Sequence, residues 1–470
     1  MDLMRGADET VADSSAWHSV RASLLSLFPE APASPPRAPR ARVLIVVAQV
    51  VAVGIGTVLL LERVPGRPSW DTIYAEDYWL FLTSALQHPW HVFVTFAGYD
   101  QFLPRVIAQF VTYFPLTQAS RLFALCGALI AAGCGLFIFH ASAGHLRSPL
   151  ARAVLGAAVV LMPMTLMELV DSAVGAPWFV MLAAFWALLW RPRTRTGMAL
   201  AALVAFAATA SVVTCVLFAP LLAARLFVLR RPREHAVTAG WLAGCLVQAP
   251  EVISGYVSGR SRLNRQQGTL GHSLAFYAHD VVLPSFGWHL AWRLQSFAGK
   301  NGATVIVGAM LTIVIVAVFV AQPRNRAFVV TAAATGFVFS VVSTTLTPHV
   351  ALVPVAPDLE SGSRYSVLPI FLFTAVAVIG VDTLMMQRGG AHRRHSVSLR
   401  PVMAVTALVA VLGASWVADF RYASFRSTGS WNWAPIAARW QDDCEHSTSG
   451  EVTEKVSVYL ETLPCQRMRR

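Results

Sequence analysis

The chain has 470 residues, of which 56% are hydrophobic and 13% are charged, against roughly 25% charged residues in an ordinary soluble domain. So few charges cannot cover the apolar surface of a soluble protein of this size, which excludes a soluble enzyme and a disordered chain. The net charge of +12 would suggest a nucleic-acid partner. We expect none, because the arginines are divided among short segments between apolar runs and are not gathered on one face.

The chain begins with a polar segment, residues 1–42, which becomes rich in proline and arginine toward its end. This composition predicts a disordered cytoplasmic tail. Apolar side chains recur at helical spacing between Trp17 and Phe28, so a short helix lying on the membrane surface is an equal alternative for that part.

The first apolar run extends from Val43 to Leu61. At about 1.5 Å per residue, it is long enough to cross a hydrocarbon core of about 30 Å. The long polar stretch that precedes it, and the lack of a small-x-small cleavage pattern before Glu62, favour an uncleaved membrane anchor over a signal peptide.

Further apolar runs follow, at about 117–141, 150–170, 175–190, 197–229, 236–256, 302–321, 327–347, 367–386 and 401–418. The run over 197–229 is too long for one span and has arginines at both ends, so we expect two shorter helices that meet near Ser211 and Thr214. Residues 43–418 are therefore predicted to form an all-α polytopic membrane domain with about 11 transmembrane helices.

Short arginine clusters separate several of these runs: Arg191, Arg193 and Arg195; Arg230, Arg231 and Arg233; Arg324 and Arg326; and Arg388, Arg393, Arg394 and Arg400. Such clusters mark cytoplasmic loops. We therefore expect a multi-pass protein with a cytoplasmic N-terminus and an extracytoplasmic C-terminus. The segments left outside are about 62–116, 257–301, 348–366 and a small C-terminal tail, 419–470. Because they are long and rich in Trp and Tyr, we expect the functional site among them.

The first outside segment, 62–116, carries the acidic residues Asp71, Glu76 and Asp77, and then an aromatic stretch from Tyr78 that predicts a helix along the membrane surface. Neighbouring side chains point in different directions, so Glu76 and Asp77 are expected to have different roles. One would act as a general base on an acceptor hydroxyl, and the other would hold the loop through backbone N–H groups at a helix start. The alternative is that both are merely solvated. Asp71 is a further candidate for contact with substrate.

Arginines in the other outside segments are candidates for binding an anion. Arg364 and Tyr365 lie where the chain enters a membrane helix, and an arginine at that depth needs an anionic partner such as a phosphate. Tyr365 offers a hydroxyl or a stacking face for a sugar, although an interfacial snorkelling pair is the plainer alternative. Arg260, Arg262 and Arg265 either face a phosphate or anionic glycan, or are simply tolerated in a long loop.

Of the six cysteines, only Cys444 and Cys465 lie in the outside tail, and the others lie within apolar runs. An oxidising compartment favours a disulfide between these two residues. Closing a loop of about 20 residues would stabilise the tail by roughly 3 kcal/mol. No Cys or His spacing typical of a metal site accompanies them, so we expect no metal there.

Two motifs resemble those of the GT-C superfamily of membrane glycosyltransferases. Tyr74–Asp77 (YAED) follows the first membrane helix, and Gly362–Tyr365 (GSRY) precedes Pro369 at the outer end of a late helix. The resemblance implies transfer of a sugar from a polyprenyl phosphate, with inversion, outside a bacterial cytoplasmic membrane. It maps the catalytic carboxylate onto Asp77 or Glu76, and we prefer Asp77 because it directly precedes the surface helix. The Glu-Asp order departs from the better-known members, which leaves donor and acceptor open.

The partners that follow are a lipid-linked sugar donor, a glycan, lipid or protein acceptor of the cell envelope, and membrane lipids. We expect no required cofactor, and the sequence gives no support for a divalent metal. A flippase or transporter of lipid-linked sugars is one alternative, but it predicts polar residues inside the spans, where few are found. A glycan ligase or polymerase centred on residues 257–301 is another.

Overall fold

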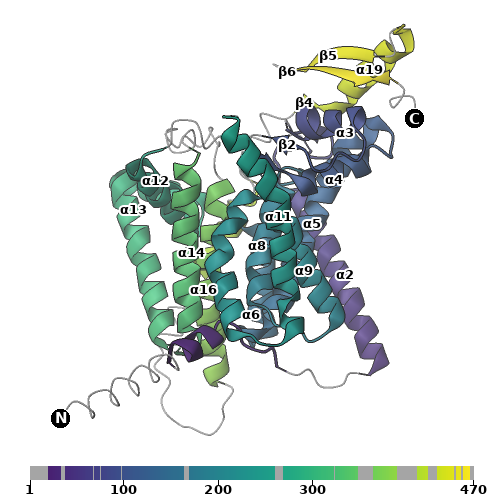
Figure 1. Cartoon of the computed structure of the whole chain (residues 1–470). Helices are drawn as coiled ribbons and strands as arrows, with labels where there is room; N and C mark the ends of the chain where they lie inside the picture. Colours follow the sequence, from purple (N-terminus) through teal and green to yellow (C-terminus); the bar gives the residue numbers. More distant parts are fainter. Residues whose placement is uncertain are drawn as a thin grey trace, which may run out of the picture.

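The chain forms a bundle of helices with smaller elements gathered at one of its ends (Figure 1). The computed structural model describes residues 19–32, 38–66, 68–74, 76–96, 98–163, 169–259, 268–321, 323–347, 364–388, 410–421, 431–448, 451–456 and 459–465. Within these ranges, six helices are long and apolar enough to cross a membrane. This agrees with the expected all-α membrane protein.

The long helices are α2 (Pro39–Leu61), α5 (Ala119–Ala141), α11 (Ala236–Val257), α13 (Trp288–Ala321), α14 (Arg326–Thr345) and α16 (Arg364–Arg388). Shorter apolar helices lie between them: α6 (Pro149–Leu161), α8 (Ala176–Leu189), α9 (Arg195–Thr209), the 3-10 helix η4 (Val213–Phe218) and α10 (Ala219–Val228). Several runs that the sequence predicts as full spans are therefore helices shorter than a membrane is thick.

Helix α8 is the centre of the bundle and α2 lies on its rim. Every residue of α8 is buried, as expected for a helix that is apolar on all sides. In α2 only Gly56, Thr57 and Leu60 are buried, and the exposed side chains are largely valine and leucine. Such a surface is stable against lipid and costly against water, which supports membrane insertion of the bundle.

Close helix packing in the bundle depends on small residues. On α5, a Cβ atom added to Gly135 would come within 2.6 Å of the carbonyl oxygen of Gly156 on α6. The reverse substitution, at Gly156, would meet the carbonyl oxygen of Gly135 at 2.7 Å. The two backbones therefore approach as closely as they do because neither residue has a side chain, a common device in membrane helix pairs.

The apolar run 197–229 is broken, as the sequence predicted. Helix α9 ends at Thr209, and η4 begins at Val213. Between them, the Ser211 hydroxyl donates to the carbonyl of Ala207 and accepts a hydrogen bond from the backbone N–H of Leu103. A serine that bonds to the preceding helical turn in this way competes with continuation of the helix.

Three arginine clusters, over 191–195, 230–233 and 324–326, lie at one end of the bundle. We call it the basic end and define it by residues 26–32, 142–148, 190–195, 229–235 and 323–326. Most of the fourth cluster lies outside the described residues. Arg191 there contacts Glu30 at 2.9 Å and Glu234 at 2.6 Å. Arg324 donates to the carbonyl of Gly144 at 2.9 Å. Loops that are separate in sequence are thus joined at this end, as the predicted cytoplasmic loops require.

Part of the segment expected to be disordered is ordered and docks on the basic end. Residues 19–25 are helical, in line with the alternative of a short helix. Leu27 and Phe28 are buried in the core of the bundle, and the guanidinium carbon of Arg225 lies 5.8 Å from the Phe28 ring centroid. The expectation of disorder is therefore wrong for residues 19–32. Apolar side chains in this segment are buried against the bundle, a contact that the composition of the tail alone does not reveal.

The opposite end, which we call the capped end, carries the π-helix η1 (Asp77–Leu82), α3 (Thr83–Gln87), α4 (Phe102–Val111) and α19 (Trp433–His446) (Figure 1). Its strands are short antiparallel pairs: β1 (Thr72–Ile73) with β4 (Trp431–Asn432), β2 (Thr95–Phe96) with β3 (Tyr99–Asp100), and β5 (Glu451–Val456) with β6 (Tyr459–Pro464). The β1–β4 pairing joins the first predicted outside segment to the C-terminal tail.

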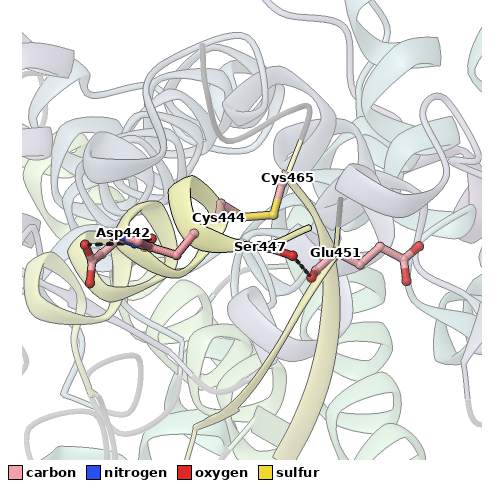
Figure 2. The surroundings of a disulfide bond; sticks show 6 residues. Asp442, Cys444, Ser447, Glu451 and Cys465 are labelled. Atoms are coloured by element: carbon pink, nitrogen blue, oxygen red, sulfur yellow. Dashed lines mark hydrogen bonds and ion pairs between the residues drawn. A yellow bond between two sulfur atoms is a disulfide. The ribbon is translucent and has the colours of Figure 1, made fainter. Parts of the chain in front are cut away.

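The tail is closed by the disulfide that the sequence predicted. Cys444 on α19 is bonded to Cys465, which directly follows β6, with a Cα–Cα distance of 5.3 Å (Figure 2). Ser447 adds a hydrogen bond of 2.8 Å to the carbonyl of Glu451 at the start of β5. The helix and the hairpin of the tail are therefore held together covalently.

The segment expected as the second outside loop is helical where it is described. Helices α12 (Leu270–Phe276), η7 (Tyr277–Val282) and η8 (Leu283–Phe286) lead into α13, which begins at Trp288. A glycine in the left-handed region, Gly299 with φ 69°, interrupts α13 close to the predicted start of the span at residue 302. The apolar run therefore lies in the second of the two helical parts of α13, just after this interruption.

Candidate active site

Asp77 begins η1 and is fully buried at the capped end. Its Oδ1 accepts a hydrogen bond of 2.9 Å from the backbone N–H of Val174, and its Oδ2 accepts one of 3.0 Å from that of Ala173. These two N–H groups directly precede α8. The carboxylate thus fixes the first outside segment to the start of the central helix, which is the loop-holding role that the sequence left to one of the two neighbouring acids.

The segment that receives Asp77, residues 169–175, is tightly packed. Asp171 adopts φ 55°, a left-handed conformation that non-glycine residues rarely take. A Cβ atom on Gly175 would lie 1.9 Å from the carbonyl oxygen of Leu169, so this turn requires glycine. The segment that donates the two N–H groups to Asp77 is therefore restricted to one backbone geometry.

Glu76, in contrast, precedes η1 as a half-buried residue and makes no side-chain cap to that helix. Its neighbour Asp77 has both oxygens engaged by backbone N–H groups and has no exposed surface. Of the two acids, Glu76 is therefore the more accessible. The preference of the sequence for Asp77 as the base is not supported by this arrangement.

A cavity of about 320 Å³ lies beside this contact. It is enclosed by residues from the β3 region, α4, α8, η4, α11, α14 and α16, and Val174, which donates to Asp77, is in its wall. Apolar side chains make up most of the lining. The volume is within the range of about 300–1,000 Å³ that small-molecule sites occupy.

Arg364 and Tyr365, at the start of α16, line the cavity. The Arg364 guanidinium carbon lies 6.0 Å from the Tyr365 ring centroid. The Tyr365 hydroxyl is 3.4 Å from Oγ1 of Thr347, and its ring meets that of Trp178 edge-on at 5.5 Å. The cavity therefore combines a cation and an aromatic hydroxyl with apolar walls.

The cavity lies directly under the outer surface of the bundle. Val216 of η4 lines it and yet keeps 50% of its surface exposed. Leu346, at the end of α14, and Val252, on α11, also belong to the wall and are half-buried. An apolar chain lying along the bundle would thus reach the cavity between η4, α11 and α14.

Other predicted site residues do not line the cavity, and Glu76 and Asp77 are among them. Asp71 is half exposed and lies 4.0 Å from Arg121 on the surface, while its backbone carbonyl accepts a hydrogen bond from the N–H of Trp433. It serves the β1–β4 contact and is outside the cavity lining. Arg260, Arg262 and Arg265 lie outside the described residues.

Asp100, on β3 between the lining residues Tyr99 and Gln101, is a buried acid close to the cavity wall. The side chain of Gln248 on α11 both donates to and accepts from its backbone, each at 2.9 Å. Burial raises the pKa of Asp100 to about 7, an increase that the nearby Arg105 opposes. The hairpin that carries Tyr99 and Gln101 is thereby clamped to α11.

Sequence reasoning missed several cavity residues with uncharged polar side chains, among them Gln101, Thr214 and Ser343. A signal was present for Ser343, because the apolar run 327–347 ends in a cluster of serines and threonines. Comparison with family models, with curated proteins and with solved structures finds no match. The chemistry of the site therefore has to be argued from its own residues.

Proposed function

We propose that this protein is an integral membrane glycosyltransferase that transfers a sugar from a polyprenyl-phosphate donor to a cell-envelope acceptor. The observation that carries the proposal is the cavity at the capped end, where Arg364 and Tyr365 stand among apolar walls. A lipid phosphate needs this combination, a cation for the head group and an apolar path for the chain.

The topology that we propose places the capped end outside a bacterial cytoplasmic membrane. Ten crossings would be formed by α2, α5, α6, α8, α9, η4 with α10, α11, α13, α14 and α16, with flanking residues completing the crossings of the shorter helices. A further crossing would end in the helix over 410–418, giving about eleven. The basic end would face the cytoplasm, because arginine-rich loops are retained there.

The proposed reaction assigns one role to each of the two acids and one to the cation. Glu76 would remove the proton from the acceptor hydroxyl. The oxygen of that hydroxyl would attack the anomeric carbon of the sugar from the face opposite the phosphate. The bond to the phosphate breaks, and Arg364 stabilises the charge that develops on the departing oxygens. Asp77 would act as a positioning residue, since its carboxylate fixes the loop that presents Glu76.

Reconstitution in vesicles with a panel of polyprenyl-phosphate sugars and envelope acceptors tests the proposal. We expect transfer by the unmodified protein and its loss in Glu76→Gln. Arg121→Gln is the matched control, because Arg121 is exposed and lies outside the cavity lining. Full activity of Glu76→Gln would exclude it as the base. Movement of lipid-linked sugar across the bilayer without transfer to any acceptor would instead establish a flippase.

A further inference from the structure

Three uncharged polar groups in the cavity have no hydrogen-bond partner among the described residues: Oε1 of Gln101, Oγ1 of Thr214 and Oγ of Ser343. Gln101 is 8% exposed and Ser343 is 1% exposed, so bulk solvent does not satisfy them. Buried polar atoms are normally paired, because an unmade hydrogen bond costs free energy. Groups of this kind lining one cavity indicate a ligand that supplies the partners.

These groups come from separate parts of the fold. Gln101 immediately precedes α4, Thr214 belongs to η4, and Ser343 lies in the last turn of α14. The amide nitrogen of Gln101 donates to the Tyr99 hydroxyl at 3.1 Å, which leaves its carbonyl oxygen as the unused group. The cavity therefore offers a carbonyl acceptor and two hydroxyls, each of which both donates and accepts.

An unpaired hydroxyl alone does not define a site, and α14 itself supplies the contrast. Ser340 is on the same helix, is fully buried and also has an Oγ without a partner among the described residues. It does not line the cavity. What distinguishes Ser343 is that its unpaired group shares one enclosed space with those of Gln101 and Thr214.

The charges of the lining restrict the ligand further. Among the described residues that line the cavity, Arg364 is the one that carries a full charge. A second charge on the ligand would therefore lie among apolar walls without a counter-ion, which is costly. The site suits a ligand with several hydroxyl groups, one anionic group and no other charge.

We propose that the cavity selects donors whose sugar is neutral, with Gln101, Thr214 and Ser343 binding sugar hydroxyls beside the phosphate held by Arg364. This inference rests on the proposed function, because it assigns the sugar to the donor of that reaction. A hexuronic acid would add an anion, and an unacylated amino sugar would add a cation. Both are disfavoured by the same lining.

Equilibrium binding to the full chain in lipid nanodiscs tests the inference separately from catalysis. The probes are a short-chain polyprenyl phosphate whose phosphate carries only a methyl group and hence one charge (the bare phosphate), one that carries a neutral hexose and one that carries a hexuronic acid. We expect the neutral glycolipid to bind about tenfold or more tightly than the bare phosphate, and the uronate to bind no better than the bare phosphate.

Ser343→Ala and Thr214→Val should each remove much of the preference for the hexose and leave binding of the bare phosphate unchanged. The controls are Ser340→Ala, on the same helix, and Thr238→Val, because Thr238 is also buried and unpaired among the described residues but lies outside the cavity. Both controls should keep the preference. Equal loss in controls and cavity variants would mean that packing, not sugar recognition, is responsible.

The outcomes separate this inference from the proposed function. Equal binding of the hexose lipid, the uronate lipid and the bare phosphate would overturn the inference, while transfer activity could still establish the glycosyltransferase. The expected preference together with no transfer to any acceptor would support the inference and overturn the proposed function.

Discussion

Replacement of Asp77 by asparagine separates an anchoring role from a catalytic one, because it keeps the size of the side chain and removes its charge. At present, the two carboxylate oxygens accept from the N–H groups of Ala173 and Val174. Asparagine has one acceptor oxygen and an NH₂ group. One of the two backbone N–H groups would therefore face a donor and lose its partner.

The expected cost follows from burial. Asp77 and Ala173 have no exposed surface, so water cannot replace the lost acceptor. A buried N–H without an acceptor costs about 1–3 kcal/mol, and the remaining bond weakens because its acceptor becomes neutral. We expect Asp77→Asn to lower the free energy of unfolding by about 1–3 kcal/mol. Glu76→Gln should lower it less, because Glu76 is only half-buried.

Thermal unfolding and hydrogen exchange of peptides that cover residues 169–178 measure this difference. Asp77→Asn should speed exchange in these peptides and lower transfer through displacement of the loop. Glu76→Gln should abolish transfer with normal exchange. If Asp77→Asn abolished transfer while stability and exchange stayed as in the unmodified protein, Asp77 would be the base and the anchoring argument would be wrong.

Other changes have distinct expected results. Arg364→Lys keeps the charge but not the planar fork, so we expect the KM for the donor to rise about tenfold with normal thermal stability, measured by donor titration. Cys444→Ser with Cys465→Ser should destabilise the tail by about 3 kcal/mol for a separation of 21 residues, measured by limited proteolysis. The Asp100 carboxyl has a pKa of 3.8 in the unfolded chain and of about 7 in the folded protein. The unfolded chain therefore releases this proton at lower pH, and the native protein loses stability as the pH rises from 3.8 to about 7. Asp100→Asn removes this loss. The gain in melting temperature of Asp100→Asn should therefore be larger at pH 8 than at pH 5, and an equal gain at both would contradict this.

The sequence predicts well those features that local pattern or topology determines. The apolar runs predict the helices because a segment that crosses lipid must be apolar along its length. The arginine clusters predict which loops lie together, because arginine-rich loops share one side of a membrane. Ser211 marks the break between α9 and η4 because its side chain acts within its own helical turn. The disulfide is predictable because Cys444 and Cys465 are the cysteines outside the apolar runs.

Features that depend on distant segments were beyond such reasoning. Which of Glu76 and Asp77 holds the loop depends on N–H groups 96 and 97 residues further along the chain. Likewise, nothing near Gln101 or Thr214 in the sequence indicates that their side chains meet Ser343 in one cavity. The burial of Phe28 could not be predicted for the same reason, because its partner Arg225 belongs to α10, far along the chain.

The C-terminal tail contacts the residues on both sides of Glu76, although it lies more than 350 residues further along the chain. The ring of Tyr78, next to Asp77, lies 6.0 Å from that of Trp433 and 5.3 Å from that of Trp440, both on α19. On the other side of the motif, β1 pairs with β4 just before α19. Glu76 therefore lies between two contacts that the tail provides. Because Cys444 lies one helical turn beyond Trp440 and ties α19 to the hairpin, the disulfide stabilises the support on which the proposed base depends.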